Sequence, residues 1–340
     1  MFRTLSRNIS KVFDVPQVST RSIYSTGTLY KKEESSEDSG PPTILVEKDA
    51  NITLIGINRP NQRNAINAST AAKLCEAFIE FEHDDTSPVA VLYGIGGSFC
   101  SGYDILELGT DGENISTDIL MAAEGSVGPT RRHIKKPVVC GVNGYCVANG
   151  LELALMCDLR VMEESAIMGF FNRRFGVPVI DGGTARLPAM IGFSRALDLI
   201  LTGRQLSAKE AFDMGIANRI VATGTALGQA VNLAFSIAKF PQAALNHDRN
   251  SLYAATFESH NFNQAIQNEV MYTSRDVIDQ MHEGIRKFNE GHVKAASTEN
   301  VKEKSMADWE RGEIDIEKEI QKEREEIKNG NGNGKGKKDA

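Results

Sequence analysis

Apolar and polar positions alternate along the middle of the chain in a pattern that predicts strands and helices in turn. Ile44–Glu47 and Ile52–Asn58 are short apolar runs on either side of a turn, and they predict two neighbouring strands. Ala68–Phe81 repeats its apolar residues at helical spacing, with Ser69 as a candidate N-cap. This part of the chain therefore begins with a strand pair followed by a helix.

Further apolar runs predict buried strands that are separated by stretches of helical periodicity. The predicted strands are Val89–Tyr93, Pro137–Val142 and Leu159–Met162, and the predicted helices are one from about Gly150, Ser194–Leu201 and Ala208–Met214. Strands that alternate with helices are typical of parallel βαβ units. After about Pro241 the strand pattern stops and only helical periodicity remains. The pattern predicts an α/β core followed by a helical region.

The N-terminus has a different character. Its first 24 residues hold four basic residues and one acid, and Leu5, Ile9 and Phe13 recur at helical spacing. An amphipathic, acid-poor segment rich in Arg and Ser is typical of a mitochondrial transit peptide, and an arbitrary disordered N-terminus is the alternative. Residues 31–42 are polar and end in two prolines, as linkers do. We expect residues 1–42 to be a transit peptide and linker, and the protein to reside in the mitochondrial matrix.

The C-terminus is dense in charge. Apolar residues within the stretch 309–328 fall at spacings of seven, four and seven, which predicts a helix with one narrow apolar seam. Docking on its own domain is favoured over an oligomer contact because the seam is short. We expect a core at 43–240, a helical region at 241–298, a charged helix at 299–328 and a disordered tail at 329–340.

Composition narrows the class of protein. The chain has 340 residues, 41% of them hydrophobic, and a formal net charge of −7, which argues against a general nucleic-acid partner. No apolar run reaches the ~18 residues that span a bilayer, so we expect no stable membrane insertion. The 5 cysteines include no CxxC pair, which fits a reducing compartment. The 6 histidines do not cluster, so we expect no metal site.

Two segments carry the candidate chemistry. In Gly97–Glu107 and in Lys136–Asp158 a buried strand ends in a turn of small residues, where backbone N–H groups can point into a pocket. One amide from each turn can hold a carbonyl oxygen as it gains negative charge. The second turn opens a helix, and Glu152 lies in its first turn. A carboxylate beside a pair of such amides favours acid–base catalysis over the alternative, an acid that only stabilises the helix dipole.

Five motifs in order resemble the crotonase superfamily, the enoyl-CoA hydratase/isomerase family, over roughly Ile44 to Phe288. They are Asn58-Arg59-Pro60 with Arg63–Asn67, Phe99–Ile105, Lys136–Asp158, Gly182–Pro188 and Leu201–Arg204. The resemblance implies an α/β fold, a crotonase-type spiral of ββα units with a C-terminal helical region that packs trimers. It also implies a coenzyme A thioester as substrate, no separate cofactor, and a homotrimer or hexamer.

The resemblance carries over residue by residue. The two oxyanion amides match Ser101 and Asn149, where the second position usually holds glycine. Residues that match the coenzyme A path are Arg63, Ala65, Ser101, Gly102, Tyr103 and Asp104. Glu152 matches one of two catalytic glutamates, and the second falls on Asn172, which cannot exchange a proton at neutral pH.

The missing carboxylate leaves three interpretations. Glu152 alone performs both proton transfers, Asp181 replaces the lost group, or the site binds acyl-CoA and does little chemistry. Asp181 is equally well explained as a helix N-cap before Gly182 and Gly183. Hydration of an enoyl-CoA by Glu152 with the Ser101 and Asn149 amides is the expected activity. An isomerase using Glu152 or Asp181, or a non-catalytic acyl-CoA-binding scaffold, is the alternative.

Overall fold

The computed structural model describes residues 41–110 and 122–291. The predicted transit peptide, charged helix and tail lie outside the described residues. The elements, in chain order, are β1 (Ile44–Asp49), β2 (Ile52–Ile57), η1 (Pro60–Gln62), α1 (Ala68–His83), β3 (Val89–Gly94), α2 (Ile105–Thr110), β4 (Val138–Val142), β5 (Tyr145–Val147), α4 (Asn149–Met156), β6 (Leu159–Glu163), β7 (Ile167–Gly169), η2 (Phe171–Phe175), α5 (Gly183–Ile191), α6 (Phe193–Thr202), β8 (Leu206–Ser207), α7 (Ala208–Met214), β9 (Arg219–Val221), α8 (Ala226–Ala238), α9 (Gln242–Phe257), α10 (Phe262–Met271) and α11 (Arg275–Asn289).

The central sheet has six strands in the order β1-β2-β3-β4-β6-β9. The hairpin partner β1 runs antiparallel to β2, and every other neighbouring pair is parallel. A smaller sheet follows the order β5-β7-β8, with β5 and β7 parallel. The prediction of an α/β core built on parallel crossovers is confirmed.

The two faces of the central sheet bury different helices because strand side chains alternate in direction. On β3, Val89 and Val91 pack with α8, whereas Ala90 and Leu92 belong to the larger core that includes α1 and α4. All four side chains are fully buried. Burying one such aliphatic side chain contributes about 1.5–3 kcal/mol, so the double-sided burial anchors the strands whose ends carry the candidate site.

Helix α1 begins at Ala68, as predicted, but its N-cap is not the expected residue. The side-chain oxygen of Asn67 accepts the backbone N–H of Thr70 at 3.0 Å, and Asn67 has extended backbone angles. Asn67 is therefore the N-cap, and the prediction of Ser69 as the cap is wrong. Asn is as good a cap as Ser, and here it stands at the residue where the chain leaves the extended conformation.

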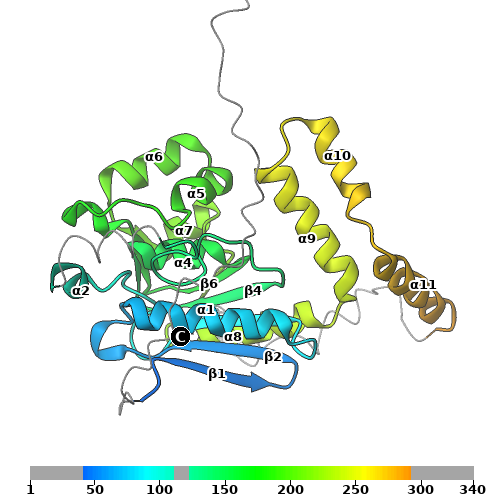
Figure 1. The fold of residues 1–340 in the computed structure, drawn as a ribbon, viewed down its shortest axis with the longest axis horizontal. Coiled ribbons are helices and arrows are strands. Elements are labelled where there is room, and N and C mark those ends of the chain that lie inside the picture. The colour runs from blue at the N-terminus through cyan, green and yellow to red at the C-terminus, as the bar shows by residue number, and fades with distance from the viewer. Residues whose placement is uncertain (1–40, 111–121, 292–340) are drawn as a thin grey trace, which may run out of the picture. The chain divides into compact units, whose positions relative to one another are not determined.

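The last three helices form a group beside the strands (Figure 1). Helices α10 and α11 both pack against α9. Asp158, immediately before β6, ties α9 to the core because it accepts the Arg249 Nε hydrogen at 2.8 Å and the Tyr253 hydroxyl at 3.1 Å. Helical structure after Pro241 is as predicted.

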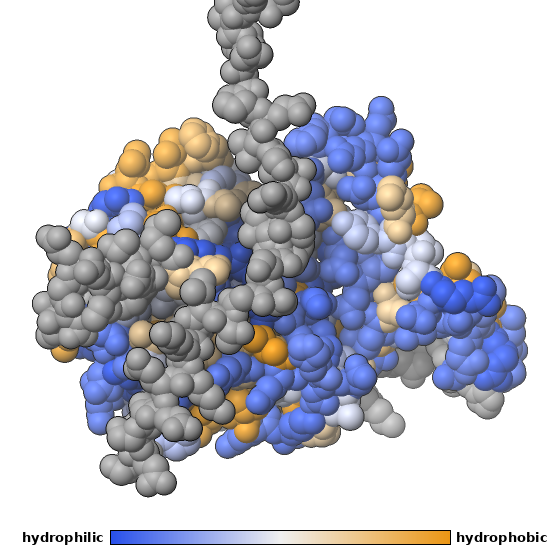
Figure 2. Space-filling model, in the orientation of Figure 1, coloured by the Kyte–Doolittle hydropathy of each residue, from blue (hydrophilic) through white to orange (hydrophobic). Residues whose placement is uncertain are grey.

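Some apolar side chains remain on the surface. Figure 2 shows one group of them over α6, where Phe193 and Leu201 are 71% and 67% exposed. Within residues 41–110 and 122–291, no helix is both long and apolar enough to cross a membrane.

Candidate active site

The two predicted turns lie against each other. Gly102, in the first turn, has φ +98°, and a Cβ added to it would lie 3.1 Å from the backbone nitrogen of Asn149. The carbonyl of Cys100 accepts the Val147 N–H at 3.0 Å, which ties the first turn to β5. A Cβ on Gly150 would lie 2.3 Å from the same Cys100 carbonyl oxygen. Glycine at 102 and 150 therefore permits an approach that larger residues would block.

The Ser101 amide of the first turn does not face the space where an oxyanion would bind. The Ser101 N–H donates to the Arg63 carbonyl at 3.1 Å, so it does not point into the space between the turns. Gly102 O and Asp104 N both bond to Ile66, each at 2.9 Å. Because successive amides of an extended segment point to opposite edges, the Tyr103 N–H is on the edge away from Ile66. The expectation that Ser101 supplies the first oxyanion amide disagrees with this geometry.

The residues predicted to contact coenzyme A lie on two segments that run side by side. Arg63, Ala65 and their neighbours pair with residues 101–104 through the bonds just described. Two of their side chains already contact other residues of the protein. Asp104 pairs with the Arg59 guanidinium at 3.1 Å, and the Arg63 guanidinium lies over the Tyr145 ring at 5.2 Å. The structure brings all six predicted residues into one strip of the molecule.

Glu152 lies in the first turn of α4 and is fully buried. Its Oε1 atom accepts the backbone N–H of Asp181 at 2.7 Å and that of Gly183 at 2.9 Å. Its Oε2 atom accepts from the side-chain amide of Asn149 at 3.2 Å. Glu152 thus satisfies the first amide of α5, which has no side-chain N-cap of its own.

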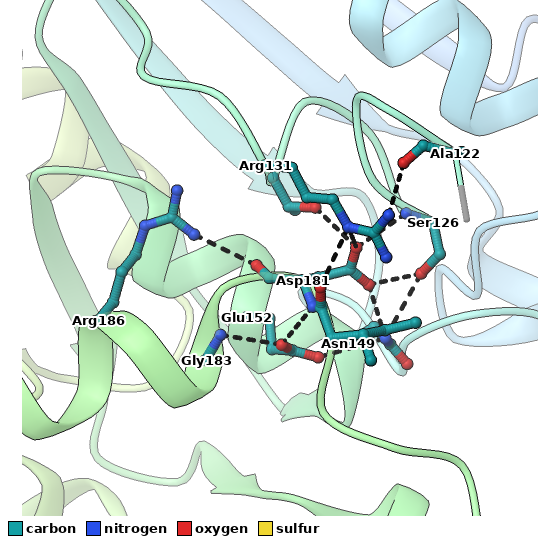
Figure 3. A network of polar contacts seen from close by, with 10 residues as sticks. Ala122, Ser126, Arg131, Asn149, Glu152, Asp181, Gly183 and Arg186 are labelled. Carbon is teal, nitrogen blue, oxygen red and sulfur yellow. Dashed lines mark hydrogen bonds and ion pairs between the residues drawn. The ribbon is translucent and has the colours of Figure 1, made fainter. Parts of the chain in front are cut away.

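Asp181 is also fully buried, and its side chain lies next to those of Asn149 and Ser126 (Figure 3). Its carboxylate accepts the backbone N–H of Ser126 at 2.8 Å, the Thr130 hydroxyl at 2.9 Å and the Asn149 amide at 2.7 Å. The Ser126 hydroxyl donates to it as well. The N-cap of α5 is Gly182, with φ +92°, so the explanation of Asp181 as that helix's N-cap is wrong.

The electrostatics of this pair explain the titration of Glu152. Burial, followed by the negative charge of Asp181, raises the pKa of Glu152 from 4.5 to about 7. The amides of Gly183 and Asp181 and the guanidinium of Arg186 act in the opposite direction. A carboxyl group that titrates near 7 can both accept and return a proton at neutral pH.

Asn172, which stands where the resemblance places a second glutamate, lies in η2 and is buried. Its side-chain amide donates to the Val177 carbonyl at 2.9 Å, while its Oδ1 atom has no hydrogen-bond partner among the described residues. The neighbouring Arg173 and Arg174 are exposed and bind the Ile200 carbonyl and the Phe171 ring, respectively. Both arginines belong to the surface rather than to the Glu152 site.

The structure adds two residues that the sequence did not single out. Ser126 and Thr130 lie between the predicted motifs, yet both are buried against Asp181. Gly125 explains their close approach, since a Cβ there would meet the Thr130 hydroxyl at 2.0 Å. Among the residues that the structure describes, no group of three or more His, Cys, Asp or Glu side chains could hold a metal ion.

Comparison with known proteins supports the family resemblance. The enoyl-CoA hydratase/isomerase family matches residues 47–295. The chain is 31% identical to the mevalonyl-coenzyme A hydratase sidH of Aspergillus fumigatus over 70% of this chain and 88% of that protein. It is 32% identical to the 1,2-epoxyphenylacetyl-CoA isomerase of Escherichia coli over 62% and 82%, respectively.

Solved structures agree in fold. The crystal structure of an enoyl-CoA hydratase from Mycobacterium tuberculosis H37Rv superposes with a TM-score of 0.67 at 33% identity, covering 74% of this chain and 96% of that one. The resemblance seen in the five motifs is therefore confirmed over most of the folded chain. With its parallel core, its two facing turns and this extent of similarity, the chain belongs to the enoyl-CoA hydratase/isomerase family, within the crotonase superfamily.

Proposed function

We propose that this protein adds water across the double bond of an enoyl-CoA thioester, with Glu152 as the acid and base. The observation that carries the proposal is the buried carboxyl group of Glu152, which lies in the first turn of α4, directly after the second turn, and has a pKa of about 7. Family membership supports an acyl-CoA substrate.

The thioester oxygen would lie between the amides of Asn149 and Tyr103. The Tyr103 amide replaces that of Ser101 in this assignment because Ser101 already donates to the Arg63 carbonyl. These two donors, with the N-terminus of α4, stabilise the negative charge that forms on the oxygen when water attacks the β-carbon. Arg63, Ala65, Ser101, Gly102 and Asp104 would line the path of the coenzyme A moiety.

Glu152 would serve both proton transfers. Its Oε2 atom takes one proton from water as the new carbon–oxygen bond forms, and the same proton then passes to the α-carbon of the enolate. Atoms and charge balance, because water contributes its hydroxyl group to one carbon and its proton to the other. A second carboxylate is not needed, which fits Asn172 at the family's second position.

Isomerisation is the second candidate, and the same observation favours it. Moving a double bond requires one group that removes a proton from one carbon and returns it to another, and Glu152 alone meets that requirement. The Escherichia coli relative described above is an isomerase. Both reactions would use the same oxyanion amides.

One assay separates these candidates. Wild type and Glu152→Gln are incubated with a panel of enoyl-CoA thioesters that differ in chain length and double-bond position, and both hydration and double-bond migration are followed. Hydration that depends on Glu152 supports the proposal, and migration without hydration favours the isomerase. Thioester binding without turnover in wild type would favour a non-catalytic scaffold.

We further propose a mitochondrial matrix location and a homotrimeric or hexameric assembly. The acid-poor N-terminus supports the first, and the exposed apolar side chains over α6 support self-association. Sequencing the mature N-terminus should reveal cleavage upstream of Lys31, and an intact Met1 in purified mitochondria would contradict it. Sedimentation equilibrium should give three or six chains, and a monomer at micromolar concentration would contradict the assembly.

A further inference from the structure

The side chain of Asn149 connects two buried carboxylates. Its amide nitrogen lies 2.7 Å from Asp181 Oδ2 and 3.2 Å from Glu152 Oε2. An amide nitrogen carries two hydrogens, so it can donate to both carboxylates at once. The Ser126 hydroxyl oxygen, at 3.4 Å, is the more distant third neighbour. Asn149 is itself buried, so water does not compete for these bonds.

The two carboxylates differ in how many further hydrogen bonds they can accept. Asp181 receives four donors, from the Ser126 amide and hydroxyl, the Thr130 hydroxyl and the Asn149 amide. Four donors fill the lone-pair positions of a carboxylate and leave no oxygen of Asp181 to accept a proton from a substrate. On Glu152, the two backbone donors fill Oε1, while Oε2 receives one donor from the part of the chain that the structure describes.

We propose that Asp181 is a positioning residue that acts on Glu152 through Asn149 and does not exchange protons with the substrate. This inference rests on the proposed function of Glu152. By accepting one hydrogen of the Asn149 amide, Asp181 orients that group so that its other hydrogen faces Glu152 Oε2. The backbone donors keep the exchangeable proton off Oε1, so the proton resides on Oε2, the oxygen that Asn149 contacts.

Asp181 also acts on Glu152 by its charge. The charged groups around Glu152 are Asp181, which precedes α5, and Arg186, which lies on α5 and donates to the Asp181 carbonyl at 3.2 Å. Arg131, from the loop that precedes β4, lies 3.7 Å from Asp181 Oδ1 and partly offsets its charge. The negative charge of Asp181 favours the protonated form of Glu152, whereas the Asn149 donor favours the ionised form. The charge of Asp181 and the hydrogen bond from Asn149 therefore shift the pKa of Glu152 in opposite directions.

Opposite effects allow a test that does not require turnover. The titration of Glu152 is followed by the infrared carbonyl band of its protonated carboxyl group, with Glu152→Gln as the spectral blank. Asp181→Asn should move the midpoint down, by about one pH unit, because a like charge is lost. Asn149→Ala keeps the backbone amide and should move the midpoint up. Thr130→Val is the matched control, since it removes a donor from Asp181 but no charge, and it should leave the midpoint in place.

Kinetics supply the second readout. Asp181→Asn should shift the rising limb of the kcat profile to lower pH together with the infrared midpoint, while KM changes less than kcat. An unchanged midpoint in Asp181→Asn would overturn the inference. Loss of turnover at an unchanged midpoint would show that Asp181 moves the proton itself, which also overturns it. If Asp181→Asn does not fold, the shift in Asn149→Ala decides: no upward movement refutes the bridge. Hydration that survives in Glu152→Gln refutes the proposed function instead, so the two failures are distinguishable.

Discussion

The Oε1 atom of Glu152, on α4, accepts the backbone N–H of Asp181 at 2.7 Å, from the turn that precedes α5. The bond joins two segments that are 29 residues apart in the sequence. It makes Glu152 both a candidate catalyst and a structural link between two helices. Its protonation state should therefore affect stability as well as chemistry.

The first prediction concerns stability and pH. The pKa of Glu152 is about 7 in the folded chain and 4.5 as an ordinary glutamate, so folding favours the protonated form. That stabilisation is fully present below about 4.5 and is lost as the pH rises through about 7. Glutamine stays neutral throughout. Between pH 4.5 and 8, the difference in free energy of unfolding should therefore move in favour of Glu152→Gln by up to about 3 kcal/mol.

Denaturant titrations of both proteins at several pH values measure this difference. Groups that do not interact with Glu152 titrate equally in wild type and variant, so their effects cancel in the subtraction. Two stability curves that remain parallel across this range would mean that Glu152 titrates normally in the folded protein.

The second prediction concerns the approach of the two turns. Gly102→Ala adds a Cβ 3.0 Å from the Ala148 Cβ, at a backbone φ of +98° that disfavours alanine. The strain should cost about 1–2 kcal/mol of stability. Separation of the turns should lower kcat by ~10–100-fold, since oxyanion donors must be well placed. Gly97→Ala is the control in the same loop, because its Cβ would meet nothing within 4 Å. Equal kcat values for the two variants would refute the assignment of the turns.

The third prediction concerns the attachment of the C-terminal helices. Tyr253→Phe removes the hydroxyl that donates to Asp158 Oδ1 at 3.1 Å, leaving the Arg249 and Val138 donors in place. Loss of one such bond should cost about 1 kcal/mol, measured by thermal or denaturant unfolding. Tyr272→Phe, on an exposed tyrosine, should change stability by less than half as much. A Tyr253→Phe protein as stable as wild type would show that the hydroxyl does not hold α9.

Local patterns predicted the parts of the fold that local physics determines. The alternation on β3 is visible in the sequence because Val89 to Leu92 bury both faces of one strand. Strands β5, β7, β8 and β9 were missed because each has two or three residues, too few to display a period. Short strands of this kind are specified by their neighbours rather than by their own composition.

The site shows the same division. Glu152 was identified from a turn that opens a helix, a feature readable within a few residues, whereas Asn149 was identified from the family resemblance. Ser126 and Thr130 were not, because their partner Asp181 is more than 50 residues away in the sequence. The Ser101 N–H was predicted to face the substrate, but in the fold it donates to the Arg63 carbonyl. The direction of a backbone N–H depends on which segment pairs with it. The type of a side chain can be read from the sequence, whereas the direction of a backbone N–H is known only from the folded structure.

The central claim is that Glu152 moves the proton. The most direct test is the steady-state hydration rate of Glu152→Gln on the enoyl-CoA that wild type hydrates best, together with the affinity of each protein for that thioester. Glutamine keeps the shape of the side chain and can still accept the Asp181 and Gly183 amides. The account predicts a fall in kcat of ~10²–10⁴-fold, with affinity unchanged within a factor of a few. A Glu152→Gln protein that hydrates at the wild-type rate would contradict the account.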